Sequence, residues 1–142
     1  LGAYVATKDP TILITGDGSF GMNLNELATA VKYNIPVVIV LVNNGVLGMV
    51  RQWQTLFYGK RYSSTVLNDA VDFVKLAEAM GAVGMKATTQ EEFKAAFAKA
   101  LTLGRPVVID CQIDSDEKVW PMVAPGAAIS EAFSEEDLEG AK

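Results

Sequence analysis

Apolar residues along the chain follow two patterns, continuous β-branched runs and runs in which every third or fourth residue is apolar. A continuous run is typical of a strand that is buried on both faces of a parallel sheet. The spacing of three and four residues predicts amphipathic helices. We expect strands at 11–15, 37–42, 82–87 and 106–111, and helices at 23–33, 46–57, 73–80 and between Thr89 and Gly104.

The order of these elements predicts the fold class. Strands that alternate with helices indicate an α/β domain, with a doubly wound parallel sheet and helices on both faces in a flavodoxin-like arrangement. Ligands of such sheets bind beyond the carboxyl ends of the strands. Two polar, glycine-containing turns, 16–21 and 43–48, fall at these ends. The functional site is therefore expected in these two turns.

Composition limits the function. The chain has 142 residues, of which 50% are hydrophobic and 20% charged, as is typical of one globular domain. Its net charge of −5 leaves no basic surplus for nucleic acid. It contains no histidine, which excludes imidazole catalysis and histidine-ligated zinc within the chain. Its single cysteine, Cys111, excludes an internal disulfide and fits a reducing compartment.

The two ends of the chain give further expectations. Residues 1–8 lack the pattern of a signal peptide. The longest apolar run, 35–42, is too short to span a bilayer, which takes ~20 residues. We therefore expect no membrane anchor and a cytoplasmic location, with a plastid as the alternative in a eukaryote. Residues 1–129 are predicted to form the domain, and 130–142 an acidic, solvated tail.

The first turn, Gly-Asp-Gly-Ser-Phe-Gly at 16–21, matches the dinucleotide-binding pattern G-x-G-x-x-G. Two features argue against a dinucleotide. The carboxylate of Asp17 would face a pyrophosphate, and like charges repel unless a cation lies between them. A dinucleotide site also needs an acid about 20 residues further on, at the end of the next strand. This chain has the amides Asn43 and Asn44 there.

A diphosphate carried on Mg²⁺ would explain both features, because Mg²⁺ takes carboxylate and phosphate oxygens as ligands. Asp17 would supply the carboxylate and Asn44 an amide oxygen. Gly18 would let the backbone approach the diphosphate, and the N–H groups of the following helix would face it. The competing interpretation is a plain turn in which Asp17 caps the helix.

The second turn, 43–48, begins with two asparagines at the end of an apolar strand. Buried amides destabilise a fold unless they are paired. Metal ligation or backbone capping would satisfy them, and the spacing leaves open which of Asn43 and Asn44 has a structural role only. Gly45 and Gly48 permit a tight turn and a close approach.

Together the two turns resemble the thiamine diphosphate motif, Gly-Asp-Gly followed by Asn-Asn after a buried strand. Further segments are similar to the catalytic large subunit of acetolactate synthase (acetohydroxyacid synthase), and the similarity covers essentially the whole chain. These segments are NGVLGMVRQWQ at 44–54, LFY at 56–58, RYS at 61–63 and PMVAPGAA at 121–128. The two turns alone indicate only the thiamine diphosphate superfamily, whereas GMVRQWQ and PMVAPGAA indicate the narrower family.

This resemblance implies a reaction. The family decarboxylates pyruvate and transfers the hydroxyethyl unit to a second 2-keto acid, pyruvate or 2-ketobutyrate, in branched-chain amino-acid biosynthesis. The implied cofactors are thiamine diphosphate and Mg²⁺, with FAD bound outside this chain. The implied partners are small-molecule 2-keto acids, a second large subunit in a homodimer and a small regulatory subunit.

The resemblance also implies roles for individual residues. Mg²⁺ would be held by the side chains of Asp17 and Asn44 and by the backbone carbonyl of Val46. Met49 and Trp53 would line the substrate channel, where Trp53 favours the larger acceptor. Ordinary core packing is the competing interpretation for the methionines and the tryptophan. The implied cofactor-binding residues are Gly16, Asp17, Gly18, Ser19, Met22, Asn44 and Met49.

The resemblance implies that a complete site needs further parts. The glutamate that activates the cofactor comes from the N-terminal domain of a partner subunit, and a middle domain holds the FAD. The first strand of the domain and part of its first helix would precede residue 1. Glu26 does not replace that glutamate, because it lies on an amphipathic helix and would face solvent. We therefore expect no catalytic residue in this chain, and little or no pyruvate turnover by the chain alone.

Three alternatives stay open. A sister thiamine diphosphate enzyme, such as glyoxylate carboligase or a 2-keto acid decarboxylase, would share the motif but not the Arg-Gln-Trp-Gln run at 51–54. A non-catalytic nucleotide-binding module would bind its ligand without Mg²⁺. An assembly fragment would use its surface for dimer contacts, and the apolar stretch 119–128 would serve as such a contact or as a flap over the site.

Overall fold

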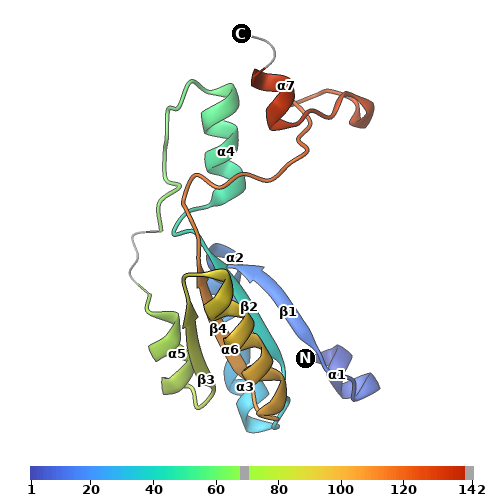
Figure 1. Ribbon diagram of the computed structural model, residues 1–142, viewed down its shortest axis with the longest axis vertical. Helices are drawn as coiled ribbons and strands as arrows, with labels where there is room; N and C mark the ends of the chain where they lie inside the picture. Colours follow the sequence, from blue (N-terminus) through green and yellow to red (C-terminus); the bar gives the residue numbers. More distant parts are fainter. Residues whose placement is uncertain (68–70, 140–142) are drawn as a thin grey trace.

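The computed structural model describes residues 1–67 and 71–139. A parallel sheet of four strands, in the order β1–β2–β4–β3, forms its centre (Figure 1). The strands are β1 (Ile12–Gly16), β2 (Val38–Asn43), β3 (Val83–Ala87) and β4 (Val107–Gln112). The helices are α1 (Gly2–Thr7), α2 (Asp17–Asn23), α3 (Glu26–Lys32), α4 (Gly48–Phe57), α5 (Phe73–Ala79), α6 (Gln90–Thr102), the 3-10 helix η1 (Ile129–Glu131) and α7 (Glu135–Glu139).

The register of the sheet aligns the four strands. Val38 of β2 lies opposite Ile12 of β1 and opposite Val107 of β4, and Val107 also lies opposite Val83 of β3. All four strands are parallel, so their carboxyl ends reach the same edge of the sheet. The predicted fold class, an α/β domain with a parallel sheet, is confirmed.

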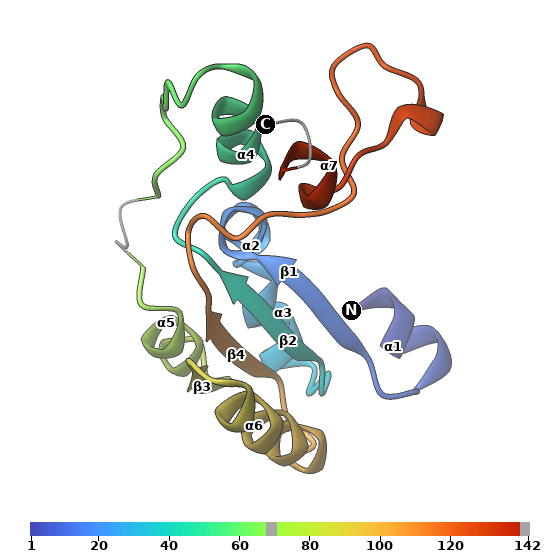
Figure 2. The ribbon, with the colours of Figure 1, turned by 45° about the horizontal axis from the view of Figure 1, so that its top comes forward.

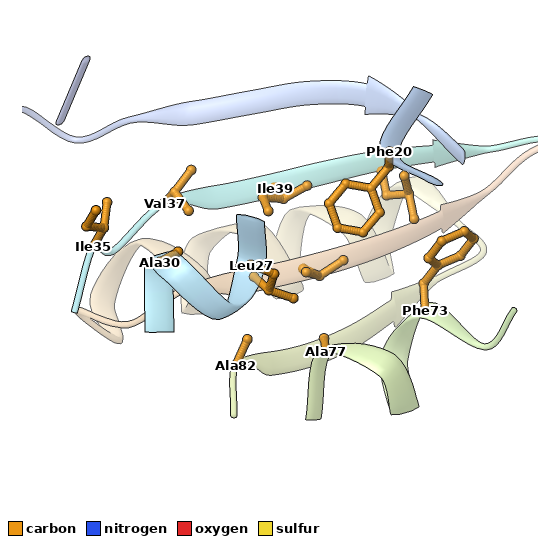
Figure 3. Packing of buried hydrophobic residues seen from close by; sticks show 11 residues of the cluster. Phe20, Leu27, Ala30, Ile35, Val37, Ile39, Phe73, Ala77 and Ala82 are labelled. Carbon is orange, nitrogen blue, oxygen red and sulfur yellow. The ribbon is translucent and has the colours of Figure 1, made fainter. Parts of the chain in front are cut away.

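Helices cover both faces of the sheet. On one face Phe20 of α2, Leu27 of α3 and Phe73 of α5 point into a shared core (Figure 3). On the other face α6 packs against Val38 and Val107. The central strand β2 therefore needs apolar residues at successive positions, because they face two cores in turn.

The edge strand β1 is far more exposed than the central strands. The exposed fractions of Ile12, Leu13 and Ile14 are 45%, 45% and 72%, whereas those of Leu41 in β2 and Ile109 in β4 are 0%. The apolar run at 11–15 does not reveal this difference, because an edge strand and a central strand can share the same composition.

Two helix boundaries correct the sequence prediction. The helix expected at 23–33 is limited to α3, and the glycine-rich turn is itself helical because α2 begins at Asp17. The helix expected from residue 46 begins at Gly48, since Val46 forms a β-bridge with Val66. The first polar turn is thus shorter than its sequence suggests.

The predicted helix ends agree better with the structure. Gly81 and Gly104 both follow helices with positive φ angles, of 87° and 59°. Thr89 accepts a hydrogen bond from the backbone N–H of Glu92, as a capping box requires. The side chain of Glu92 differs from the expected pattern, because it accepts from the N–H and the hydroxyl of Thr88.

The C-terminal segment lies beside α4, beyond the carboxyl ends of the strands (Figure 2). Phe133 and Met122 exchange two backbone hydrogen bonds of 2.8 Å. The segment predicted as an acidic tail, 130–142, contains α7 and the last two residues of η1, and its residues 140–142 lie outside the described part of the chain. Among the described helices, none has the length and apolar character that a membrane span requires.

Candidate functional site

Polar side chains from three strand ends surround a cavity of about 920 Å³ at the carboxyl edge of the sheet. Asp17 follows β1, Asn43 ends β2, Asn44 comes next in the chain, and Asp110 lies near the end of β4. We call Asp17, Asn43, Asn44, Gly45 and Asp110 the strand-end site. The parallel register brings these residues together although up to 93 positions separate them, the difference between 17 and 110.

Asp17 connects the two predicted turns. Its side chain is buried, with an exposed fraction of 6% for the residue. One carboxylate oxygen accepts from the N–H of Gly18 at 3.0 Å, and the other accepts from the N–H of Gly45 at 2.9 Å. The helix cap is Gly16, with no side-chain hydrogen bond. Asp17 is therefore not a simple helix cap, because it also holds the next strand end, 28 residues away.

The electrostatics of Asp17 suit a cation. Burial raises the pKa of its carboxyl group above the usual 3.8, and the negative charge of Asp110 acts in the same direction. The hydrogen bonds from Gly18 and Gly45 oppose this shift. A cation bound at this carboxylate would offset the unfavourable burial of its charge.

The two asparagines have different partners. The Nδ2 group of Asn43 donates to Oδ1 of Asp110 at 2.9 Å, and its Oδ1 accepts from the N–H of Gly45 at 3.2 Å. Asn44 uses its Oδ1 to accept from the N–H of Val46, also at 3.2 Å. Asn43 thus contacts another strand 67 residues away, whereas Asn44 contacts a near neighbour in sequence, which favours Asn43 for the structural role.

Two glycines beside the strand-end site, Gly18 and Gly48, lie close to neighbouring side chains. A methyl group on Gly48 would lie 2.6 Å from Nδ2 of Asn44, so a larger residue would displace that amide. A methyl group on Gly18 would lie 2.8 Å from Cδ2 of Leu47. At Gly48 the group that approaches closely is therefore the side chain of Asn44.

The other predicted site residues, on α2 and α4, differ in their exposure to solvent. Ser19 and Met22 lie on α2 and are exposed, Met22 at 75%. Met49 on α4 is 51% exposed. Core packing is therefore wrong for both methionines. Trp53 is half-buried, and its ring meets that of Phe57 edge-on, with a centroid separation of 5.6 Å.

Met49 and Trp53 belong to a second, apolar pocket of about 610 Å³. We call it the α4 pocket, and its lining residues are Met49, Val50, Trp53, Gln54, Tyr58 and Arg61. The structure therefore places the predicted substrate-channel residues together, and separates them from Asp17 and Asn44, which line the strand-end cavity.

Long-range contacts hold α4 against the C-terminal segment. The buried side chain of Gln52 donates to the carbonyl of Val119 at 3.0 Å and accepts from its N–H at 2.9 Å. The guanidinium of Arg51 contacts Asp116 at 2.7 Å and lies over the ring of Tyr62, 4.1 Å from its centroid. These contacts attach α4, which supplies Met49, Val50 and Trp53 to the α4 pocket, to the C-terminal segment.

Asp110 is the residue of the site that sequence analysis missed. It is 5% exposed and interrupts the apolar run of β4. A charged residue in a buried strand needs a partner, and this interruption was the available signal. Its partner, Asn43, is 67 residues away and could not be identified from the sequence.

The donor set at the strand ends fits a hard cation. The predicted ligands are a carboxylate, an amide oxygen and a backbone carbonyl, which are oxygen donors of the kind that Mg²⁺ prefers. Within the described residues, no group of three or more histidine, cysteine, aspartate or glutamate side chains is arranged to bind a metal.

Comparison with known proteins establishes the family. Residues 1–111 match the model of the thiamine pyrophosphate enzyme C-terminal TPP binding domain. The chain belongs to this family. The glycine-rich turn therefore belongs to a thiamine diphosphate-binding domain, and not to a dinucleotide-binding or other nucleotide-binding module. The predicted resemblance to thiamine diphosphate enzymes is confirmed.

Curated relatives support the narrower resemblance. The chain is 44% identical over 133 residues to the acetolactate synthase large subunit of Haemophilus influenzae, and the match covers 92% of this chain and 23% of that protein. It is 46% identical over 132 residues to the acetolactate synthase isozyme 2 large subunit of Escherichia coli, covering 92% of this chain and 24% of that protein. The chain therefore spans about a quarter of the length of these relatives.

A solved structure supports the fold as well. The thiamine diphosphate-dependent 4-hydroxybenzoylformate decarboxylase of Rhodococcus jostii RHA1 matches with a TM-score of 0.75 and 35% sequence identity. The match covers 82% of this chain and 22% of that chain. The parallel sheet and the helices on its faces are therefore shared with a thiamine diphosphate enzyme.

Proposed function

We propose that this chain is the Mg²⁺- and diphosphate-binding domain of an acetolactate synthase large subunit. The observation that carries the proposal is the contact of Asp17 with Gly45, which joins the Gly-Asp-Gly and Asn-Asn turns at one edge of the sheet. Sequence identities of 44% and 46% to acetolactate synthase large subunits support the narrower assignment.

In this proposal the strand-end site holds the cofactor. The carboxylate of Asp17, the side-chain oxygen of Asn44 and the carbonyl of Val46 bind Mg²⁺. Gly16, Gly18 and Ser19 contribute to the diphosphate site, and Met22 and Met49 to the remainder of the cofactor pocket. When bound, thiamine diphosphate supplies the electron sink for decarboxylation of a 2-keto acid. The protein binds and orients it, and this chain contributes no acid–base group to the reaction.

The α4 pocket is proposed as part of the substrate channel. Its lining is largely apolar, with Met49, Val50 and Trp53 from one face of α4. The indole of Trp53 would contact the alkyl group of the acceptor and favour 2-ketobutyrate over pyruvate. An apolar wall discriminates by about 1–3 kcal/mol for each methylene of the substrate.

The whole enzyme is proposed to need parts beyond this chain. They are an N-terminal domain with the activating glutamate, a middle domain with FAD, a second large subunit and a small regulatory subunit. The exposed apolar residues of β1 support a preceding segment of the domain that covers this edge of the sheet. Two expectations stay predictions. They are the end of the domain at residue 129 and a cytoplasmic location, with a plastid as the alternative in a eukaryote.

A binding titration tests the proposal. Thiamine diphosphate is added to the chain with and without Mg²⁺ while the fluorescence of Trp53 and Trp120 is followed, with NAD as the control ligand. We expect saturable binding that requires Mg²⁺. Metal-independent binding of NAD would contradict the proposal. If neither ligand binds the chain, the same titration of the full-length dimer decides, and failure there would also contradict it.

Two product assays define the reaction. The full-length protein should convert pyruvate to 2-acetolactate and, with 2-ketobutyrate present, form 2-aceto-2-hydroxybutyrate. Free aldehyde as the main product would favour a sister decarboxylase instead. The isolated chain should produce no detectable acetolactate, and formation of the product by the chain alone would show that the missing domains are not needed.

A further inference from the structure

Asp110 is a buried carboxylate to which neither the motif nor the proposed function gives a role. It lies in β4, opposite Leu41 of β2 and opposite Lys86 of β3. Its Oδ1 atom accepts a hydrogen bond of 2.9 Å from Nδ2 of Asn43. If one partner of this buried contact were removed, the other would lose its hydrogen bond, which is unfavourable. We therefore expect that Asp110 and Asn43 depend on each other.

The contact with Asp110 fixes the orientation of the Asn43 amide. Because Nδ2 faces the carboxylate, Oδ1 faces the N–H of Gly45, from which it accepts at 3.2 Å. A flipped amide would direct Nδ2 at the N–H of Gly45 and Oδ1 at the carboxylate, and both contacts would be repulsive. The acceptor at Asp110 therefore selects one of the two orientations.

The same N–H group of Gly45 also donates to Asp17. Its hydrogen bond to Oδ2 of Asp17 measures 2.9 Å, so this N–H lies between the Asn43 amide and the Asp17 carboxylate. Gly45 has a φ of 68°, a left-handed conformation that glycine adopts without strain. The loop at Gly45 is thus held from two sides, and its neighbours in sequence are Asn44 and Val46.

We propose that Asp110 is a positioning residue for the Mg²⁺ site. By orienting Asn43, it holds Gly45 against Asp17 and so places the three proposed ligands, Asp17, Asn44 and Val46, relative to one another. This inference rests on the proposed function, because it concerns the same cation. It assigns Asp110 no contact with Mg²⁺ or with substrate, and the hydrogen-bond acceptor at Oδ1, not the charge, is the property that matters.

The decisive test compares two substitutions of Asp110 in the full-length protein. Asp110→Ala removes the acceptor, whereas Asp110→Asn keeps an oxygen acceptor and removes the charge. We expect Asp110→Ala to raise the Mg²⁺ concentration for half-maximal thiamine diphosphate binding by ~10-fold or more, the range typical of outer-shell partners of a metal site. Asp110→Asn should shift it far less. Cys111→Ala, next in β4 and on the opposite face, is the matched control and should leave it unchanged.

A second variant pair keeps the test decisive if Asp110→Ala fails to fold. Asn43→Ala should raise the Mg²⁺ concentration for half-maximal thiamine diphosphate binding, as Asp110→Ala does. The double variant Asp110→Asn/Asn43→Asp exchanges the hydrogen-bond donor and acceptor and keeps an acceptor for the N–H of Gly45. It should therefore bind thiamine diphosphate at a lower Mg²⁺ concentration than Asn43→Ala does. In the absence of metal, the Gly45 amide should exchange its hydrogen faster in Asn43→Ala than in the exchanged pair, a readout that does not depend on activity.

The outcomes separate the inference from the proposed function. If Asp110→Asn weakens Mg²⁺-dependent binding as much as Asp110→Ala, the charge is what matters and the positioning role is overturned. Unchanged binding in both Asp110→Ala and Asn43→Ala would also overturn it. Asp17→Ala serves as the reference: retained Mg²⁺-dependent binding in that variant would contradict the proposed function itself.

Discussion

The strand-end site and the α4 pocket are built on different physical principles. In the strand-end site, the sheet register brings polar residues together, and hydrogen bonds of 2.9–3.2 Å join Asp17, Gly45, Asn43 and Asp110. The α4 pocket has a largely apolar lining, and α4 is held to the C-terminal segment by a few side-chain contacts. We infer that the sheet provides a fixed site for the cofactor, while the helix provides a surface that can differ between enzymes with different substrates.

The largest expected effect follows from removal of the carboxylate that joins the two turns. Asp17→Ala should weaken Mg²⁺-dependent thiamine diphosphate binding by at least the ~100-fold that marks the upper range for outer-shell partners, because a proposed ligand of the metal is lost. Isothermal titration measures the change. Trp53→Leu in the α4 pocket is the control and should leave this binding unchanged; a similar loss in both variants would mean that the two regions do not act separately.

The second prediction concerns the attachment of α4. Gln52→Leu removes two hydrogen bonds to the backbone of Val119, and each contributes about 0.5–1.5 kcal/mol. The free energy of unfolding should therefore fall by about 2 kcal/mol in a urea titration. Gln54→Leu removes hydrogen bonds to Ser63 at an exposed position and should have a smaller effect. Equal losses would contradict the importance of the Gln52 contact.

A smaller effect is expected from crowding one ligand. Gly48→Ala places a methyl group 2.6 Å from Nδ2 of Asn44 and should displace that side chain. Mg²⁺ affinity should drop by ~10-fold, the lower limit for a change that displaces a ligand indirectly. Gly21→Ala, where no atom lies within 4 Å of the added methyl group, is the matched control. If Gly21→Ala lowered the Mg²⁺ affinity and Gly48→Ala did not, the cation would not be bound beside Asn44.

The smallest expected effect is the pH dependence of the Arg51–Asp116 contact. The hydrogen bond from Arg51 lowers the pKa of Asp116 below 3.8. An acid whose pKa is lowered on folding adds stability above its unfolded value, and this contribution is lost as the pH falls through the folded value. The difference in melting temperature between the native chain and Asp116→Asn should therefore be larger at neutral pH than below 3.8. A constant difference would mean that the charge of Asp116 does not stabilise the fold.

Short-range patterns were sufficient to predict much of the fold. The strand at 37–42 and the helix end at Gly81 follow from hydrophobic runs and from glycine, which depend on neighbours in sequence. Residue chemistry also predicted that Asp17 and the amides at the next strand end would lie together. The edge position of β1 did not follow, because exposure depends on which elements pack against a strand.

Contacts between distant positions could not be predicted. Asn43 meets Asp110 and Gln52 meets Val119 across 67 residues in each case, and no local pattern connects the members of either pair. For the same reason the spacing could not distinguish the role of Asn43 from that of Asn44. The distinction became available only when the sheet register placed β4 beside β2.

The location of the cation is the most direct test of the proposed function. Mn²⁺ in place of Mg²⁺ broadens the amide resonances of nearby residues in a ¹⁵N-labelled protein, and thiamine diphosphate is present in both samples. Broadening that is strongest at Asp17, Asn44 and Val46, and that weakens along α4 towards Trp53, is the expected result. Broadening centred on the acidic residues of α7, or spread over the surface without a centre, would contradict a metal site at the strand ends.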